Sequence, residues 1–175
     1  MDVEGEFSLL HNEVLGSNKH LVVVKSISKS YGVPGIRLGV LASGDTELIA
    51  ELKKEVAIWN INSFGEFYMQ IYEKYHKYYL RACEQFRAER KIFFEELQQI
   101  PFLRVIPSQA NYFMCELVGD KFSSHELAVQ LLSKFNILIK DCSGKSAFDG
   151  GEYIRIAVRD RKDNHRLVEA LKMFV

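Results

Sequence analysis

Residues 21–43 read LVVVKSISKSYGVPGIRLGVLAS, and they are the most informative part of the chain for its fold class. Leu21–Val24 is a short β-branched run bounded by polar residues, which is typical of a parallel strand buried on both faces. Residues 25–35 combine small hydroxyl side chains, two glycines and one proline, so they predict a loop. A second strand is expected over Ile36–Ala42. A helix should follow over Thr46–Ala57, capped by Asp45 or Thr46, and this order is typical of an α/β fold.

The loop carries the most reactive side chains of the chain. Lys29 lies between Ser28 and Ser30, and Arg37 follows eight residues later. A lysine amine becomes a nucleophile when a desolvated site and a neighbouring cation lower its pKa, and a guanidinium binds phosphate in a bidentate manner. The spacing alone favours a solvated Ser/Lys loop with a surface arginine.

Helical patterns surround this region on both sides. A short helix is expected over Phe7–Leu15, with Gly16 after it. A nearly continuous helical pattern runs from Ser63, a candidate cap with Glu66 at capping-box spacing, to Ile100. That length exceeds an ordinary helix, so we expect two helices that divide near residues 74–78.

The remainder changes to short strands separated by helices. The expected strands are 103–106, 111–117, 137–140 and 153–158, and the expected helices are 123–135 and 163–174. This order predicts a compact α+β unit, with a domain boundary inside the long helical region near Cys83. The chain therefore divides into residues 1–80 and 81–175.

Composition narrows the class of protein. The chain has 175 residues, of which 47% are hydrophobic, and 23 basic residues balance 23 acidic ones. This composition favours a folded core and offers no net charge to attract nucleic acid or a membrane. Three separated cysteines, no secretory leader and no apolar run of about 20 residues indicate a soluble cytoplasmic protein. The scattered histidines form no metal-ligand spacing.

Four segments carry a resemblance to a known family. Ser26–Gly39 resembles the pyridoxal 5′-phosphate (PLP) attachment segment of the class I/II aminotransferases, which are fold-type I enzymes. Pro107–Phe113, Lys140–Ser143 and Tyr153–Arg159 resemble the small-domain segments of histidinol-phosphate aminotransferase and threonine-phosphate decarboxylase. The likeness spans nearly the whole chain.

The resemblance implies a role for several residues. Lys29 would form the aldimine with PLP and later shuttle the α-proton, while Ser26, Ser28 and Arg37 would hold the cofactor phosphate. Arg155 would bind the substrate α-carboxylate. Arg159 would bind a second anionic group such as a substrate phosphate, or would be a solvated charge at a strand end.

The resemblance also implies that the chain is a C-terminal part of a longer enzyme. Residues 1–80 would be the remnant of the PLP-binding large domain, and 81–175 the complete small domain, so that an α/β fold passes into an α+β fold. Family members place a phosphate-binding helix N-terminus, a stacking aromatic residue, an Asn, an Asp and a Tyr before the lysine. None precedes Lys29, so we expect this fragment to be inactive without the missing N-terminal half. A homodimer is also expected.

Two classes of function follow. The parent protein would be a PLP-dependent aminotransferase acting on an amino acid or amino-phosphate in a biosynthetic route, or alternatively a PLP-dependent amino-acid-phosphate decarboxylase. The isolated chain would instead be a non-catalytic module for dimerisation or packing. A nucleotide-binding loop is not favoured, because neither Gly-x-x-x-x-Gly-Lys nor Gly-x-Gly-x-x-Gly occurs after the strand.

Overall fold

The structure, a computed structural model, describes residues 8–145 and 150–175. The chain forms two compact units that divide between Arg81 and Ala82. The elements of the first unit are α1 (Asn12–Ser17), β1 (Val22–Ser26), α2 (Ile27–Ser30), the 3-10 turn η1 (Pro34–Ile36), β2 (Gly39–Ser43), α3 (Thr46–Glu55) and the first part of α4 (Ser63–Leu97).

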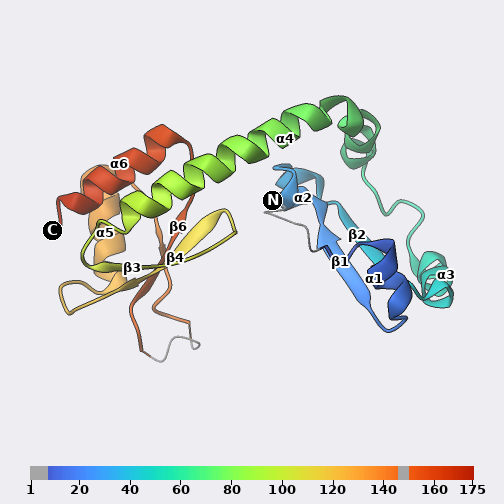
Figure 1. The fold of residues 1–175 in the computed structure, drawn as a ribbon, viewed down its shortest axis with the longest axis horizontal. Coiled ribbons are helices and arrows are strands. Elements are labelled where there is room, and N and C mark those ends of the chain that lie inside the picture. Colours follow the sequence, from blue (N-terminus) through green and yellow to red (C-terminus); the bar gives the residue numbers. More distant parts are fainter. Residues whose placement is uncertain (1–7, 146–149) are drawn as a thin grey trace. The chain divides into compact units, whose positions relative to one another are not determined.

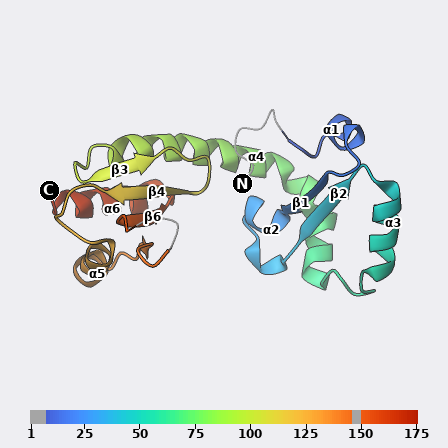
Figure 2. The ribbon, with the colours of Figure 1, turned by 90° about the horizontal axis from the view of Figure 1, so that it is seen from below.

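Strands β1 and β2 run antiparallel, and their pairing extends from Val22 opposite Ser43 to Ser26 opposite Gly39 (Figure 2). The prediction of a parallel strand buried on both faces is therefore wrong. Val24 is 74% exposed, and Val22 is also exposed. A run of four apolar residues indicates a strand but not its partner; here the loop after β1 turns the chain back alongside it.

The structure confirms the predicted start of one helix of this unit and shifts the start of another. Helix α3 was expected at its observed start, and the carboxylate of Asp45 caps it by accepting the N–H groups of Glu47 and Leu48. Helix α1 is shorter and starts later than the predicted Phe7–Leu15, of which Phe7 lies outside the described residues. The Ser8 hydroxyl accepts the N–H of Leu10, and this local turn delays the helix.

Helix α4 is one continuous helix of 35 residues, so the predicted division near residues 74–78 is wrong. No proline or glycine interrupts the helix after Gly65, and the helical spacing of its apolar residues persists through the predicted break. The Asn62 side chain accepts the N–H of Gly65 at 2.9 Å, so Asn62 takes the position that we predicted for Ser63.

The second unit is built on a four-stranded antiparallel sheet in the order β3-β4-β6-β5. Figure 1 labels its strands β3, β4 and β6. Its elements are β3 (Leu103–Ile106), β4 (Tyr112–Leu117), α5 (Ser124–Phe135), β5 (Lys140–Asp141), β6 (Tyr153–Ala157) and α6 (Arg161–Lys172). The predicted strand 137–140 shrinks to two residues. Asn136, which follows α5, has a left-handed backbone conformation (φ 53°), and the N–H of Ile137 donates to the carbonyl of Leu131. Residues 137–139 therefore continue from the C-terminal end of the helix as a connection rather than as a strand.

One face of this sheet is buried and the other is open. Alternate positions of β3, β4 and β6 join a core with α5, α6 and the end of α4, for example Phe93, Phe113, Leu127 and Ile154. The opposite positions form what we call the open face of the sheet, which includes Arg104, Tyr112, Met114, Glu116, Lys140 and Arg155. Among the described residues, no helix has the length and apolar character that crossing a membrane requires.

Candidate functional site

Lys29 lies in a tight turn that follows β1 without a break. It is the third residue of α2 and its side chain is exposed. Backbone bonds from Tyr31 to Ile27, from Gly32 to Lys29 and from Val33 to Ser28 close the turn. Gly32 adopts φ 70°, a left-handed conformation that glycine reaches without strain. The predicted loop is thus an ordered turn with Lys29 on its outside.

Ser28 joins the two ends of this loop. Its hydroxyl accepts the N–H of Leu38 at 2.8 Å and donates to the Leu38 carbonyl at 3.2 Å. Ser28 is almost fully buried, and so is Leu38. Because the hydroxyl proton is already donated, binding of the cofactor phosphate by Ser28 would require that proton to leave the Leu38 carbonyl. That role stays a prediction.

Arg37 stands at the other end of the loop, directly after η1. Its backbone is left-handed (φ 54°, ψ 39°) and its side chain is exposed. The neighbouring carbonyl of Ile36 accepts a hydrogen bond from the Asn62 side chain at 2.8 Å. Since Asn62 also caps α4, one amide ties the loop to the start of that helix.

The loop brings three of the predicted residues into one segment. Ser26 pairs with Gly39 at the last step of the ladder, so Ser26 and Arg37 flank the base of the loop that carries Lys29. In the part of the chain that the structure describes, these three side chains make no hydrogen bond or ion pair. A hydroxyl, an amine and a guanidinium are a donor set that fits a phosphorylated aldehyde such as PLP.

Aromatic side chains of α4 pack against the loop that carries Lys29. The Tyr31 ring lies 4.6 Å from that of Tyr79 and 5.1 Å from that of Tyr72, measured between centroids. The Tyr79 hydroxyl donates to the carbonyl of Ser30 at 3.3 Å. Tyr68 lines a small cleft beside Tyr31, and burial, followed by the proximity of Tyr31, raises the pKa of Tyr68. These contacts hold the turn that carries Lys29.

Arg155 lies on the open face of the second unit. Its guanidinium sits 5.1 Å from the centre of the Tyr112 ring, which is a cation–π contact. No carboxylate within the described residues pairs with Arg155, whereas Arg104 on the same face is paired with Glu116. An exposed guanidinium without an acidic partner is available for an anionic ligand.

Lys140 is a site candidate that the sequence interpretation missed. In the register of β5 and β6 it lies directly opposite Arg155, and both side chains are exposed on the open face. Like charges at directly opposed positions repel, and an anion between them would remove that cost. The only sequence signal was the position of Lys140 in a segment already quoted for its family resemblance; the pairing could not be read from it.

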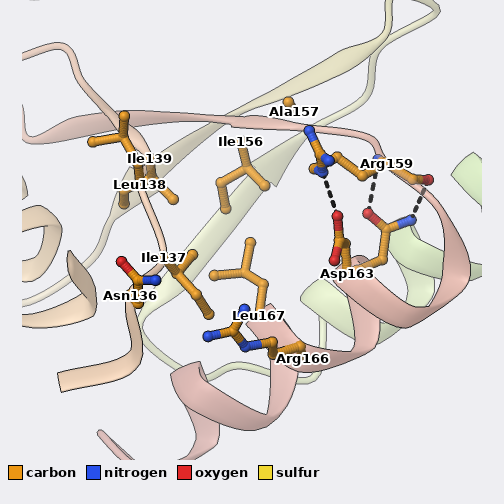
Figure 3. A pocket seen from close by; sticks show the side chains of 11 residues that line it. Asn136, Ile137, Leu138, Ile139, Ile156, Ala157, Arg159, Asp163, Arg166 and Leu167 are labelled. Atoms are coloured by element: carbon orange, nitrogen blue, oxygen red, sulfur yellow. Dashed lines mark hydrogen bonds and ion pairs between the residues drawn. The ribbon is translucent and has the colours of Figure 1, made fainter.

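Arg159 borders a different feature, a cleft of about 300 Å³ beside α6 (Figure 3). Its guanidinium contacts Asp163 at 2.6 Å, and its backbone N–H donates to the Asn164 side chain at 2.8 Å. The bond to Asp163 raises the pKa of Arg159. Asp163 therefore already neutralises this charge, and binding of a second substrate anion by Arg159 stays a prediction.

The chain is similar to several known proteins. A CMP-5′-(3-aminopropyl)phosphonate synthase from Streptomyces rubellomurinus is 39% identical over 92% of this chain and 26% of its own length. An L-serine phosphate decarboxylase from Sulfurospirillum multivorans is 36% identical over 87% of this chain and 39% of its own. The solved histidinol-phosphate aminotransferase from Clostridium acetobutylicum superposes with a TM-score of 0.80 at 31% identity, over 91% of this chain and 47% of that one.

The fold is therefore the C-terminal part of the fold-type I PLP enzymes. Residues 5–171 match the family described as aminotransferase class I and II, and the chain belongs to that family. The cofactor of the family is PLP. The chain spans less than half of the length of the relatives named above.

Proposed function

We propose that the whole protein of which this chain forms part is a PLP-dependent enzyme acting on an amino acid or an amino-phosphate. The observation that carries this proposal is the ordered loop between β1 and β2, which carries Lys29 and has Ser26 and Arg37 at its two ends. Membership of the aminotransferase class I and II family supports it. PLP, when bound, withdraws electrons from the substrate α-carbon so that a bond to that carbon can break.

The residues of this chain would bind the cofactor, transfer a proton and bind the substrate. The Lys29 amine would hold the cofactor aldehyde and, once released by substrate, would carry a proton on its Nζ atom to and from the α-carbon. Arg37 and Ser26 would hold the cofactor phosphate by charge and hydrogen bonding, with Ser28 closing the loop beneath them. Arg155 would bind the substrate carboxylate, and Lys140 would share that anion.

Transamination is the first candidate reaction, as the family description supports. Decarboxylation is the second, because the relatives include an L-serine phosphate decarboxylase at 36% identity and a Salmonella typhimurium threonine-phosphate decarboxylase at 29%. Product analysis separates them: transamination yields an oxo product and an aminated cofactor, whereas decarboxylation releases CO₂ and leaves the amine on the product.

Borohydride trapping tests the role of Lys29. The full-length protein is incubated with PLP, reduced and mapped by mass spectrometry, together with a Lys29→Arg variant that keeps the charge but cannot form the covalent link. We expect the label on Lys29 in the wild type and loss of the visible absorbance of lysine-bound PLP in the variant. Labelling spread over other lysines, with unchanged absorbance in the variant, would refute the proposal.

We further propose that the 175-residue chain needs the rest of its protein and a second copy for activity. The exposed apolar side chains around residues 56–67, among them Ile58, Trp59 and Phe64, support a partner surface in the first unit. The three cysteines, all free, support the separate proposal of a cytoplasmic enzyme. Titration of the 175-residue chain with PLP tests the first point, because tight Lys29-dependent uptake by this chain alone would contradict it.

A further inference from the structure

Strand β5 is too short to fix its own position. It consists of Lys140 and Asp141, which pair with Arg155 and Ile154 of β6. Two ladder residues provide little stabilisation. Lys140 and Arg155 also carry like charges at directly facing positions, and their repulsion weakens the pairing of β5 with β6. The N–H of Cys142 adds one backbone bond, to the carbonyl of Tyr153 at 2.9 Å, and a contact from α5 adds to it.

Ser124 makes that contact through two of its atoms. It is the first residue of α5 and is completely buried. Its hydroxyl donates to the carboxylate of Asp141 at 2.8 Å, and its backbone N–H donates to the carboxylate of Glu152 at 2.6 Å. Asp141 ends β5 and Glu152 immediately precedes β6, so Ser124 holds both neighbouring strands.

The carboxylate of Asp141 and the backbone of Glu152 are themselves held by other groups. Asp141 also accepts the N–H of Ser143 at 2.9 Å, and the His125 ring lies 3.4 Å from its second oxygen. The backbone carbonyl of Glu152 accepts the N–H of Leu117 at 2.8 Å, which ties it to the end of β4. Because side chains alternate along a strand, Asp141 faces the helices while Lys140 projects from the open face.

We propose that Ser124 is a positioning residue, which holds Lys140 and Arg155 side by side so that the two cations bind one substrate anion. The inference rests on the proposed function, since it takes Arg155 as a substrate ligand. Ser124 itself is buried and does not touch the anion. The hydrogen bonds from Ser143 and Ser124 lower the pKa of Asp141 to about 2, so this carboxylate stays charged in neutral solution and accepts strongly.

Ser123 supplies a matched control. Its hydroxyl accepts the N–H of Glu126 in a capping box, so Ser123→Ala weakens the same helix end without touching Asp141 or Glu152. Inorganic phosphate is the probe, titrated into the ¹⁵N-labelled 175-residue chain while the Nε–H resonance of Arg155 is followed. The resonance is assigned by its loss in Arg155→Lys.

Ser124→Ala should weaken phosphate binding at Arg155 by about fivefold or more, while Ser123→Ala binds within about twofold of the wild type. Equal affinities in the two variants would overturn the inference and leave the proposed function standing. A wild-type Arg155 that does not respond to phosphate would instead refute its role in anion binding, and the inference with it.

Asp141 provides a second pair of variants should Ser124→Ala fail to fold. Asp141→Asn and Asp141→Ala remove the same negative charge, but only asparagine keeps an oxygen that can accept from Ser124 and Ser143. Loss of the charge alone should leave phosphate binding equal or tighter, so we expect near wild-type or tighter binding in Asp141→Asn and weaker binding in Asp141→Ala. The same affinity in both variants would show that the hydrogen bonds do not position the cations.

Discussion

The hydroxyl of Ser28 bonds to both backbone groups of Leu38, accepting from its N–H and donating to its C=O. The same carbonyl also accepts the N–H groups of Ile27 and Ser28, so backbone and side-chain bonds together continue the link between β1 and β2 beyond the pair of Ser26 and Gly39. The loop with Lys29 therefore begins and ends at a fixed place. Ser28, for which the family resemblance implies a role in cofactor binding, therefore also has a structural role.

Ser28→Ala should destabilise the chain by about 1–3 kcal/mol, because it leaves the buried N–H of Leu38 without its acceptor. Urea unfolding followed by circular dichroism measures this. Ser30→Ala is the control, since the Ser30 hydroxyl makes only an exposed bond to the Ser26 carbonyl and its loss should cost much less. Equal midpoints for the two variants would show that the Ser28 bonds contribute little.

Arg155→Gln should raise the KM of the full-length enzyme at least tenfold, since about 1.4 kcal/mol or more of charge-assisted binding is lost. Steady-state kinetics with an amino acid phosphate as substrate measures the change. Arg104→Gln is the matched variant on the same face, because Glu116 already neutralises that arginine. An increase of equal size in Arg104→Gln would argue for a general effect of surface charge rather than for a specific ligand.

Acid should weaken the contribution of Asp141 to folding. The pKa of Asp141 is lowered from 3.8 to about 2 in the folded chain, first by the backbone N–H of Ser143. A carboxyl group with a lowered folded-state pKa stabilises the fold above its unfolded pKa, and that stabilisation is lost as pH falls from about 4 towards 2. The stability difference between wild type and Asp141→Asn should therefore narrow over this range. Thermal unfolding at a series of pH values tests it, and a constant difference would contradict the prediction.

The core of the second unit should depend strongly on Leu127. This side chain is fully buried between α5 and the sheet, so Leu127→Ala should cost about 2–5 kcal/mol through lost contacts and a cavity. Val129→Ala on the same helix removes an exposed side chain and should change stability by only about 0.5 kcal/mol. Chemical unfolding of both variants provides the comparison; a small loss in Leu127→Ala would mean that the surrounding core collapses into the space.

Local signals in the sequence predicted the second unit well. The strand at Leu103–Ile106 and the helix ending at Phe135 follow from alternation, helical spacing and a capping serine, which are all short-range features. The two wrong predictions, for β1 and for α4, concern properties that short-range features of the sequence do not determine. The direction of β1 depends on where the loop returns the chain, and the continuity of α4 depends on the absence of any residue that breaks it.

The candidate site shows the same limit. The segment around Lys29 is identified through its resemblance to a family, because its residue spacing alone favours a solvated loop. Lys140 was missed because its relation to Arg155 exists only across two paired strands. The ion pair between Arg159 and Asp163 joins residues four apart on the chain, a spacing that the sequence alone contains.

Arg37 occupies a backbone conformation that ordinary side chains avoid and that glycine adopts freely. Glycine at this position would relieve the strain and make the loop more stable, at the loss of the guanidinium. An arginine held there against local preference is what a binding role would require. Selection of this chain for stability alone should accordingly enrich replacements at position 37 that a cofactor-dependent selection would reject.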